Sequence, residues 1–196
     1  MATLVSRIND VVAAIGADIK ALQAAQDIFC RTTSSYTLAN NTTFQKLLNV
    51  STNGAVAVLA NSSYDFECFF ILTGMSATSG NVGFSIQGAG TASVSPAHWI
   101  AIGRDAATST GTAAGAMGGM VATAEQFTNN IVTAATATEM YVLIKGTFVT
   151  GASNGTIIPS VKLTTAVATA AVSIGAYFKC RRLGASTGTV TQGTWT

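Results

Sequence analysis

Near the N-terminus, apolar side chains recur with the alternating three- and four-residue spacing of a coiled-coil seam. The seam positions are Val5, Ile8, Val12, Ile15, Ile19, Leu22, Gln26 and Phe29. An amphipathic helix packed on its own domain is the alternative, but such a helix normally carries a wider apolar stripe. We therefore predict a coiled-coil and anchoring helix over residues 1–30.

The residue types in this seam predict how many copies associate. β-Branched side chains dominate both seam positions. Isoleucine at both positions disfavours two strands and shifts the preference to three or four. Gly16 costs an isolated helix about 1 kcal/mol relative to alanine, so further copies would stabilise it. The pattern predicts a homotrimer whose oligomer interface is the seam, with the Gln26 amides fixing the register near its end.

Beyond the helix, the pattern changes to the alternation of short β-strands separated by Gly, Asn and Ser clusters. The runs that we interpret as strands are 44–50, 55–60, 64–73, 82–88, 98–103, 139–150, 156–165 and 172–182. Many short strands with short connections predict a mainly β fold, a jelly-roll-like antiparallel β-sandwich. We assign residues 31–36 to a linker, 37–184 to the sandwich and 185–196 to a C-terminal tail.

Two runs show which side chains face the core. In the first, Tyr64, Phe66, Cys68, Phe70 and Leu72 share a face, and in the last, Val172, Ile174, Ala176, Phe178 and Cys180 do. We expect both faces, including Phe66 and Phe178, to be buried. Phe69 and Ile71 make the opposite face of the first run apolar as well, so another sheet or another copy of the chain must cover it.

One stretch fits two descriptions. Residues 104–130 are small and Gly-rich, which suits either a long surface loop or a weak strand pair.

Composition and charge exclude several classes of protein. Although 48% of the residues are hydrophobic, no run approaches the ~18 consecutive apolar residues of a membrane span. Arg7, Asp10 and Asp18 interrupt any signal-peptide core, so we expect synthesis in a cytoplasm. The net charge is +2 and the ten basic residues are dispersed, which does not favour nucleic-acid binding.

Few residues suggest a catalytic or metal-binding site. The three cysteines are far apart and His98 is the single histidine, so we expect no metal or other cofactor. Asp65 and Glu67 would lie roughly 7 Å apart on one strand face, within the range of an inverting glycosidase pair. Carboxylates spaced in this way are common on exposed strands, however, and we do not expect an enzyme.

Both ends of the chain resemble proteins of tailed bacteriophages. The stretch SRINDVVAAIGADIKAL resembles the short oligomerising helices that begin many phage fibre and structural proteins. The C-terminal part is similar to the closing strands of trimeric phage jelly-roll domains at Gly146, Phe148, Gly155, Thr156, Gly175, Leu183 and Gly184. The tail GTVTQGTWT is similar to the short Trp-ending tails of such proteins.

The resemblance implies a virion structural protein made in the host cytoplasm. It would be a homotrimeric short fibre or a head or tail decoration protein, anchored by its helix to capsid, portal or tail proteins. The alternative is a receptor- or glycan-binding adhesin, in which His98, Trp99 or Trp195 contacts a host surface glycan. A glycan-cleaving enzyme that uses Asp65 and Glu67 is the third hypothesis.

Overall fold

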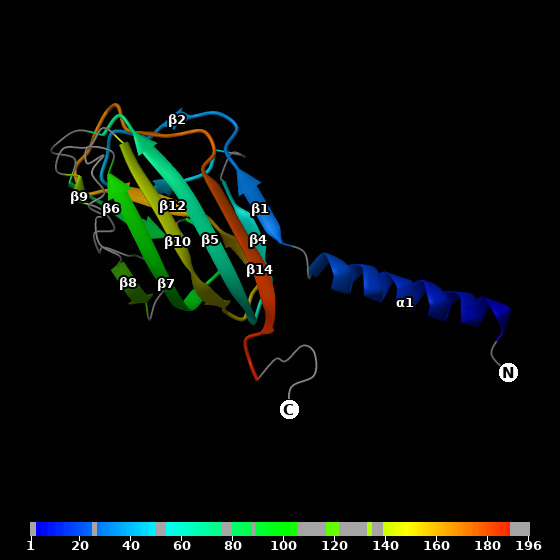
Figure 1. The fold of residues 1–196 in the computed structure, drawn as a ribbon. Coiled ribbons are helices and arrows are strands. Elements are labelled where there is room, and N and C mark those ends of the chain that lie inside the picture. Colours follow the sequence, from blue (N-terminus) through cyan, green and yellow to red (C-terminus); the bar gives the residue numbers. More distant parts are fainter. Residues whose placement is uncertain are drawn as a thin grey trace.

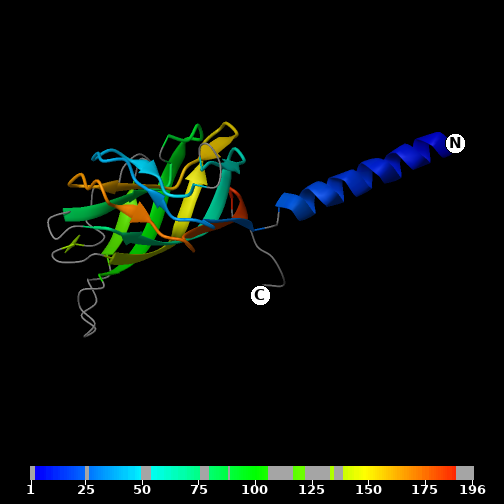
Figure 2. The same cartoon turned by 90° about the horizontal axis from the view of Figure 1, so that it is seen from above.

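The computed structural model describes most of the chain, namely residues 3–24, 27–49, 54–75, 80–87, 89–105, 117–121, 133–134 and 139–188. The fold is mainly β, with antiparallel sheets and one N-terminal helix, as the sequence predicted (Figure 1). Seen from above, the helix projects from a body built of two layers (Figure 2).

Helix α1 spans Leu4–Ala24. It begins at a threonine cap, because the Ser6 backbone N–H donates to Thr3 Oγ1 at 3.3 Å and the Arg7 N–H donates to the Thr3 carbonyl at 3.1 Å. Between Leu4 and Ile19, the large apolar side chains of the helix are exposed.

Strands make up the rest of the described structure. They are β1 (Ile28–Arg31), β2 (Tyr36–Thr37), β3 (Gln45–Lys46), β4 (Val56–Val58), β5 (Ser62–Thr73), β6 (Gly80–Ser85), β7 (Val94–Asp105), β8 (Met117–Val121), β9 (Thr133–Ala134), β10 (Glu139–Thr150), β11 (Gly155–Ile157), β12 (Ser160–Leu163), β13 (Ala171–Val172) and β14 (Tyr177–Ala185).

These strands form one large layer and one smaller layer. The eight-stranded sheet has the order β1-β14-β5-β10-β7-β8, and β13 joins it beside β5 and pairs with β2. The second layer holds a four-stranded sheet, β3-β12-β6-β9, and the pair β11-β4. We call the side of the eight-stranded sheet that faces away from the second layer the outer face; it is turned toward the viewer in Figure 1.

The core lies between the layers and is organised around Phe84 of β6. Its ring lies 6.3 Å from that of Phe66, 6.5 Å from that of Phe70 and 6.1 Å, edge-on, from that of Trp99. All four side chains are buried. The predicted inner face of β5 is therefore confirmed, and Phe178 is buried as expected.

The N-terminal boundary differs from the prediction. Residues 28–31 form β1 instead of continuing the helix, and Phe29 lies opposite Lys179 of β14. Antiparallel pairing with β14 places Ile28 and Cys30 toward the core, which satisfies the backbone and the apolar side chains together. The predicted linker also belongs to the body, because Thr32 is buried and its hydroxyl donates to the Ser173 or Ala176 carbonyl.

Two predicted strands are each divided. Run 156–165 breaks at Pro159, so that β11 pairs with β4 and β12 pairs with β3 and β6. Run 172–182 breaks at Gly175, which has a φ of +89°. The break turns Ile174 outward, to 60% exposure, so our placement of this residue on the core face was wrong.

Part of the Gly-rich stretch 104–130 contains a strand, because β8 pairs with β7 along the edge of the eight-stranded sheet. The remaining residues of that stretch beyond Asp105, and residues 189–196 of the predicted tail, lie outside the described residues. Gln26 and Trp195 are among the residues that are not described.

Candidate functional site

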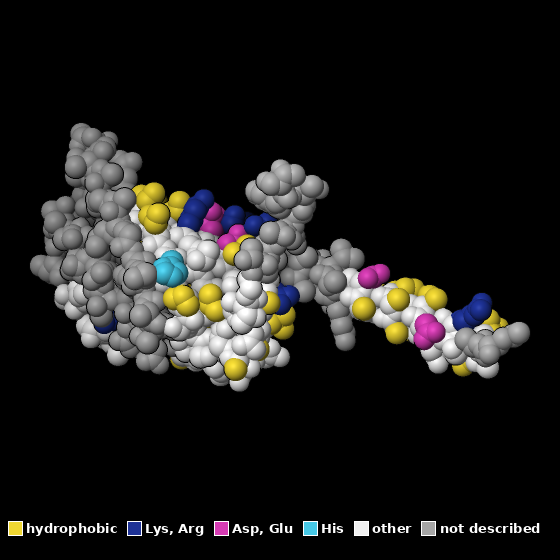
Figure 3. All heavy atoms as spheres, turned by 90° about the horizontal axis from the view of Figure 1, so that it is seen from below, with side chains coloured by type: hydrophobic (Ala, Val, Ile, Leu, Met, Phe, Trp, Pro, Cys, Tyr) yellow, Lys and Arg dark blue, Asp and Glu magenta, His cyan; other side chains and the backbone are white. Residues whose placement is uncertain are grey.

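The predicted oligomer interface lies on a helix that does not bury it within its own chain. Val5, Ile8, Val12, Ile15 and Ile19 are between 50% and 66% exposed. Leu22 lies in α1, whereas Phe29 lies in β1 and so leaves the helical seam. The space-filling view in Figure 3 shows hydrophobic side chains along the isolated helix. The seam of α1 is therefore available to other chains.

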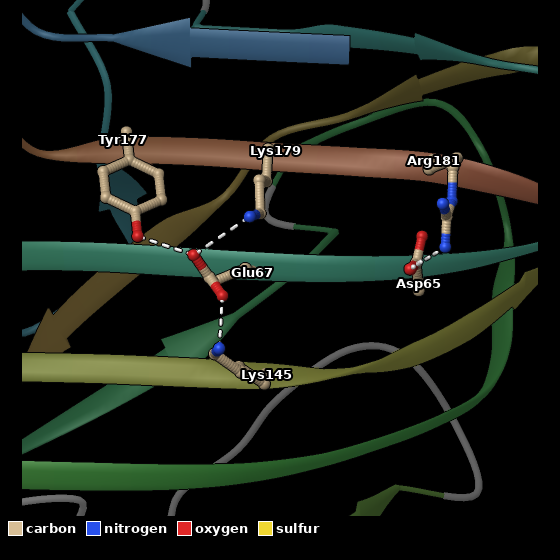
Figure 4. A network of polar contacts seen from close by, with 6 residues as sticks. All are labelled: Asp65, Glu67, Lys145, Tyr177, Lys179 and Arg181. Atoms are coloured by element: carbon tan, nitrogen blue, oxygen red, sulfur yellow. Dashed lines mark hydrogen bonds and ion pairs between the residues drawn. The ribbon is translucent and has the colours of Figure 1, made fainter. Parts of the chain in front are cut away.

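A second group of side chains lies on the outer face of the eight-stranded sheet, where β5, β10 and β14 are neighbours (Figure 4). Glu67 of β5 is at its centre. Lys145 Nζ lies 2.6 Å from Glu67 Oε2, and Lys179 Nζ lies 3.3 Å from Oε1. The Tyr177 hydroxyl donates to Oε1 at 2.6 Å. Cross-strand register explains this convergence, since Lys145 and Lys179 lie directly opposite Glu67 on the two flanking strands.

These partners hold Glu67 in its charged form. Its pKa is lowered from 4.5 to about 2, chiefly by the hydrogen bond from Lys145, then by those from Tyr177 and Lys179, although desolvation opposes the change. The hydrogen bond to Glu67 also raises the pKa of Tyr177 to about 12, because ionisation of the phenol would place two negative charges together. At neutral pH the group is a carboxylate held by two ammonium groups and a phenol.

Asp65 lies further along the same strand and has its own partner. Arg181 Nη2 of β14 donates to Asp65 Oδ2 at 3.1 Å. Within the described residues, Asp65 Oδ1 is buried and has no hydrogen-bond partner. We call Asp65, Glu67, Lys145, Tyr177, Lys179 and Arg181 the charged cluster.

The arrangement of the cluster does not suit glycoside cleavage. An inverting pair needs one carboxyl group that stays protonated near neutral pH, so its pKa must be raised. The pKa of Glu67 is instead lowered, and Asp65 is held by Arg181. Glu67 therefore lacks the property that the acid of such a pair requires.

An open cavity of about 380 Å³ lies beside the charged cluster. Its lining residues are Asp27, Asp65, Phe66, Glu67, Lys145, Gly146, Lys179, Cys180 and Arg181. Three of these side chains are cationic and three are anionic, so the charges balance. Small-molecule sites are usually concave and mostly apolar, and this cavity is open and mostly charged.

Next to the cluster, apolar side chains form a continuous line across the outer face. We call this line the apolar row. Across β14, β5, β10 and β7 it consists of the cross-strand neighbours Tyr177, Phe69, Leu143 and Ile102. Phe29 of β1 lies opposite Lys179 and joins the row diagonally, beside Tyr177. The Tyr177 ring lies 5.9 Å from those of Phe29 and Phe69. Charged and hydrophobic side chains lie side by side along the upper margin of the body in Figure 3.

The three candidate ligand-binding residues do not lie together. His98 is exposed on the outer face of β7, opposite Thr147. Trp99 points to the core and is only 6% exposed, so it does not have the exposed position that a glycan contact requires. Alternation along β7 separates the two, because neighbouring side chains in a strand point to opposite faces. Trp195 lies outside the described residues.

Sequence reasoning missed most of the charged cluster. Asp65 and Glu67 were noticed, but Lys145, Tyr177 and Lys179 lie far away along the chain and meet Glu67 only through strand pairing. Alternation in the run 172–182 did place Lys179 opposite its core face, whereas no face was predicted for Lys145. Which residues they would meet depended on the register of the sheet.

The described residues also bear on metal binding, membrane spanning and the state of the cysteines. Among the residues that the structure describes, no three His, Cys, Asp or Glu side chains are grouped so as to hold a metal ion. Within the same part of the chain, no helix has the length and apolar character needed to cross a membrane. Cys68 and Cys180 are free and buried, as expected, and burial raises the pKa of both thiols.

Comparison with known proteins gave no assignment. No protein-family model matches the sequence, and no curated protein matches it significantly.

Proposed function

We propose that this protein is a structural subunit of a tailed-bacteriophage virion, a homotrimeric short fibre or a head or tail decoration protein anchored by α1. The observation that carries the proposal is the exposure of the seam, whose described β-branched side chains are all at least half exposed. Most of the stability of a helix in a protein comes from packing its apolar face, and α1 packs this face against nothing among the described residues. Its apolar side therefore calls for a partner outside the chain.

Identical copies are the partner that fits the seam best. The apolar spacing continues through three heptads of α1, and a parallel homomeric coiled coil places each layer against the same layer of its neighbours. Val5, Val12 and Ile19 occupy one seam position, and Ile8 and Ile15 occupy the other. β-Branched side chains at both positions favour three strands over two. A parallel trimer would also carry all three β bodies at the same end, where they would be displayed together.

For the body, we propose a jelly-roll-like sandwich. It is supported by two antiparallel layers that share one core. The virion assignment itself rests on the resemblance of both ends of the sequence to phage proteins. Few charges and many small residues suit an assembly that must persist outside a cell.

Light scattering on the full chain tests the trimer. The wild type is expected to have about three times the 19.9 kDa mass of one chain. Replacing Ile15 and Ile19 by Asp would put six charges into a dry seam, so this variant, the seam variant, is expected to be monomeric. The control is Ala13→Asp with Ala17→Asp, which adds the same charge on the opposite side of the helix and should leave the trimer intact.

The two parts of the proposal fail separately. A wild-type mass near that of a single chain would contradict the trimer. The virion assignment is tested by antibody labelling of phage particles from a culture that produces the chain. Particles that never carry the label would contradict a virion role even if the purified protein is trimeric.

A further inference from the structure

The apolar row on the outer face has no covering element among the described residues. Phe29 is 60% exposed and Ile102 is 52% exposed, and Ile100, next to the row on β7, is 60% exposed. Because the row crosses five adjacent strands, it extends over about 19 Å, taking the strand spacing as about 4.8 Å. Tyr177, Phe69 and Leu143, between the two exposed ends, are partly buried. A contiguous apolar surface that crosses a whole sheet is typical of an interaction site.

The charges beside the row restrict which partner fits. Lys145 and Lys179 are paired with Glu67, and Arg181 is paired with Asp65. Each cation therefore contacts a carboxylate, but Lys145 and Lys179 share Glu67, so the charged cluster has three cations and two anions. Asp27, which lines the same cavity, brings the charges of the lining into balance. A net charge of +1 on the cluster gives little attraction to nucleic acid or to an anionic membrane, whose binding requires a larger excess of positive charge.

A small ligand also fits the surface poorly. The cavity beside the cluster is lined mostly by charged side chains, whereas the exposed apolar side chains form a line across the sheet. A protein surface can cover both features at once, with the apolar row inside the contact and the paired charges at its rim.

The short connection between α1 and the body indicates which protein covers the outer face. Phe29, at one end of the row, follows the end of α1 at Ala24 by five residues, a reach of at most about 18 Å. In a coiled coil the helices lie about 8–10 Å apart, so three seams brought together hold three Phe29 side chains close to one axis. Such a short connection raises the effective concentration of neighbouring bodies to about the millimolar range, where even a weak contact is occupied.

We propose that the outer faces of the three bodies line the threefold axis and that the apolar rows pack against one another there. This inference rests on the proposed trimer and adds a second interface to it. The occupant of the outer face is then two further copies of the same chain. Lys145 and Lys179, which are exposed in the single chain, become covered in the assembly.

Lysine acylation of the full chain, read by mass spectrometry, tests this arrangement. Rates at Lys145 and Lys179 are compared between the wild type and the seam variant at one protein concentration. We expect the wild-type rates to be lower by about fivefold or more, since an effective concentration well above the dissociation constant leaves few faces open. Lys162 of β12, in the other layer, is the internal control and should react equally in both chains.

A substitution within the apolar row shows whether the contact between rows causes the protection of the two lysines. Ile102→Glu is expected to restore the reactivity of both lysines while the helices keep the mass trimeric. Ile100→Glu provides a second variant at a similarly exposed position; because residue 100 lies opposite Lys145, this variant is read at Lys179. The control is Leu59→Glu, which places the same charge at an exposed apolar residue outside the row and should preserve protection.

Each possible result of these experiments decides one part of the proposal. A trimeric wild type whose lysines react as fast as those of the seam variant would overturn the second interface and leave the coiled coil. Protection that persists in both isoleucine variants would overturn the role of the row. A monomeric wild type would overturn the proposed trimer, and this inference with it.

Discussion

Truncating Phe178 to alanine is expected to lower the free energy of unfolding by about 3–5 kcal/mol. The side chain is fully buried on β14, and its ring lies 5.9 Å from that of Phe66 on β5. Loss of burial alone accounts for about 1.5–3 kcal/mol. The remainder comes from the cavity that the missing ring would leave, because the neighbouring strands are held by their ladder and relax only in part.

Phe29 provides a matched control on the adjacent strand. It is the same residue type on β1, which pairs with β14, but it points to the outer face and is 60% exposed. Because less than half of its surface is covered within the chain, Phe29→Ala is expected to cost at most about 1 kcal/mol. The two substitutions thus differ mainly in the direction of the side chain.

The measurement is urea unfolding followed by circular dichroism. It is made in the seam variant at one fixed protein concentration, so that association of copies does not add to the unfolding free energy. A loss below about 1 kcal/mol for Phe178→Ala, or equal losses for the two substitutions, would refute the assignment of inner and outer faces.

Three further outcomes are expected. Gly146→Ala should destabilise the body by about 1–3 kcal/mol, because the added Cβ would overlap the His98 carbonyl oxygen on the neighbouring strand; an unchanged urea midpoint would contradict this close contact. The pKa of Glu67 is lowered from 4.5 to about 2, so its stabilising effect is present above pH 4.5 and is lost as the pH falls to 2; Glu67→Gln should flatten the dependence of unfolding free energy on pH over that range, and parallel curves would contradict it. Half-buried Cys30 should react with a thiol reagent before fully buried Cys68, as peptide mapping of the labelled chain would show.

Local periodicity was sufficient to predict the helix and the long strands. The seam from Val5 to Ile19 and the alternation from Tyr64 to Leu72 each depend on side-chain direction within one segment. The same alternation correctly placed Phe69 and Ile71 on the face opposite the core of β5. These features follow from the sequence by itself, because neighbours along the chain determine which side chains share a face.

Tertiary pairing decided the remainder. Phe29 continues the helical spacing, yet it lies in a strand because β14 offers the segment from Ile28 a backbone ladder and a core for alternate side chains. Glu67 meets Lys145 and Lys179 because the register aligns three strands that are distant in the chain. Contacts across a sheet depend on which strands become neighbours and in what register, and a one-residue shift would turn each of these side chains to the other face.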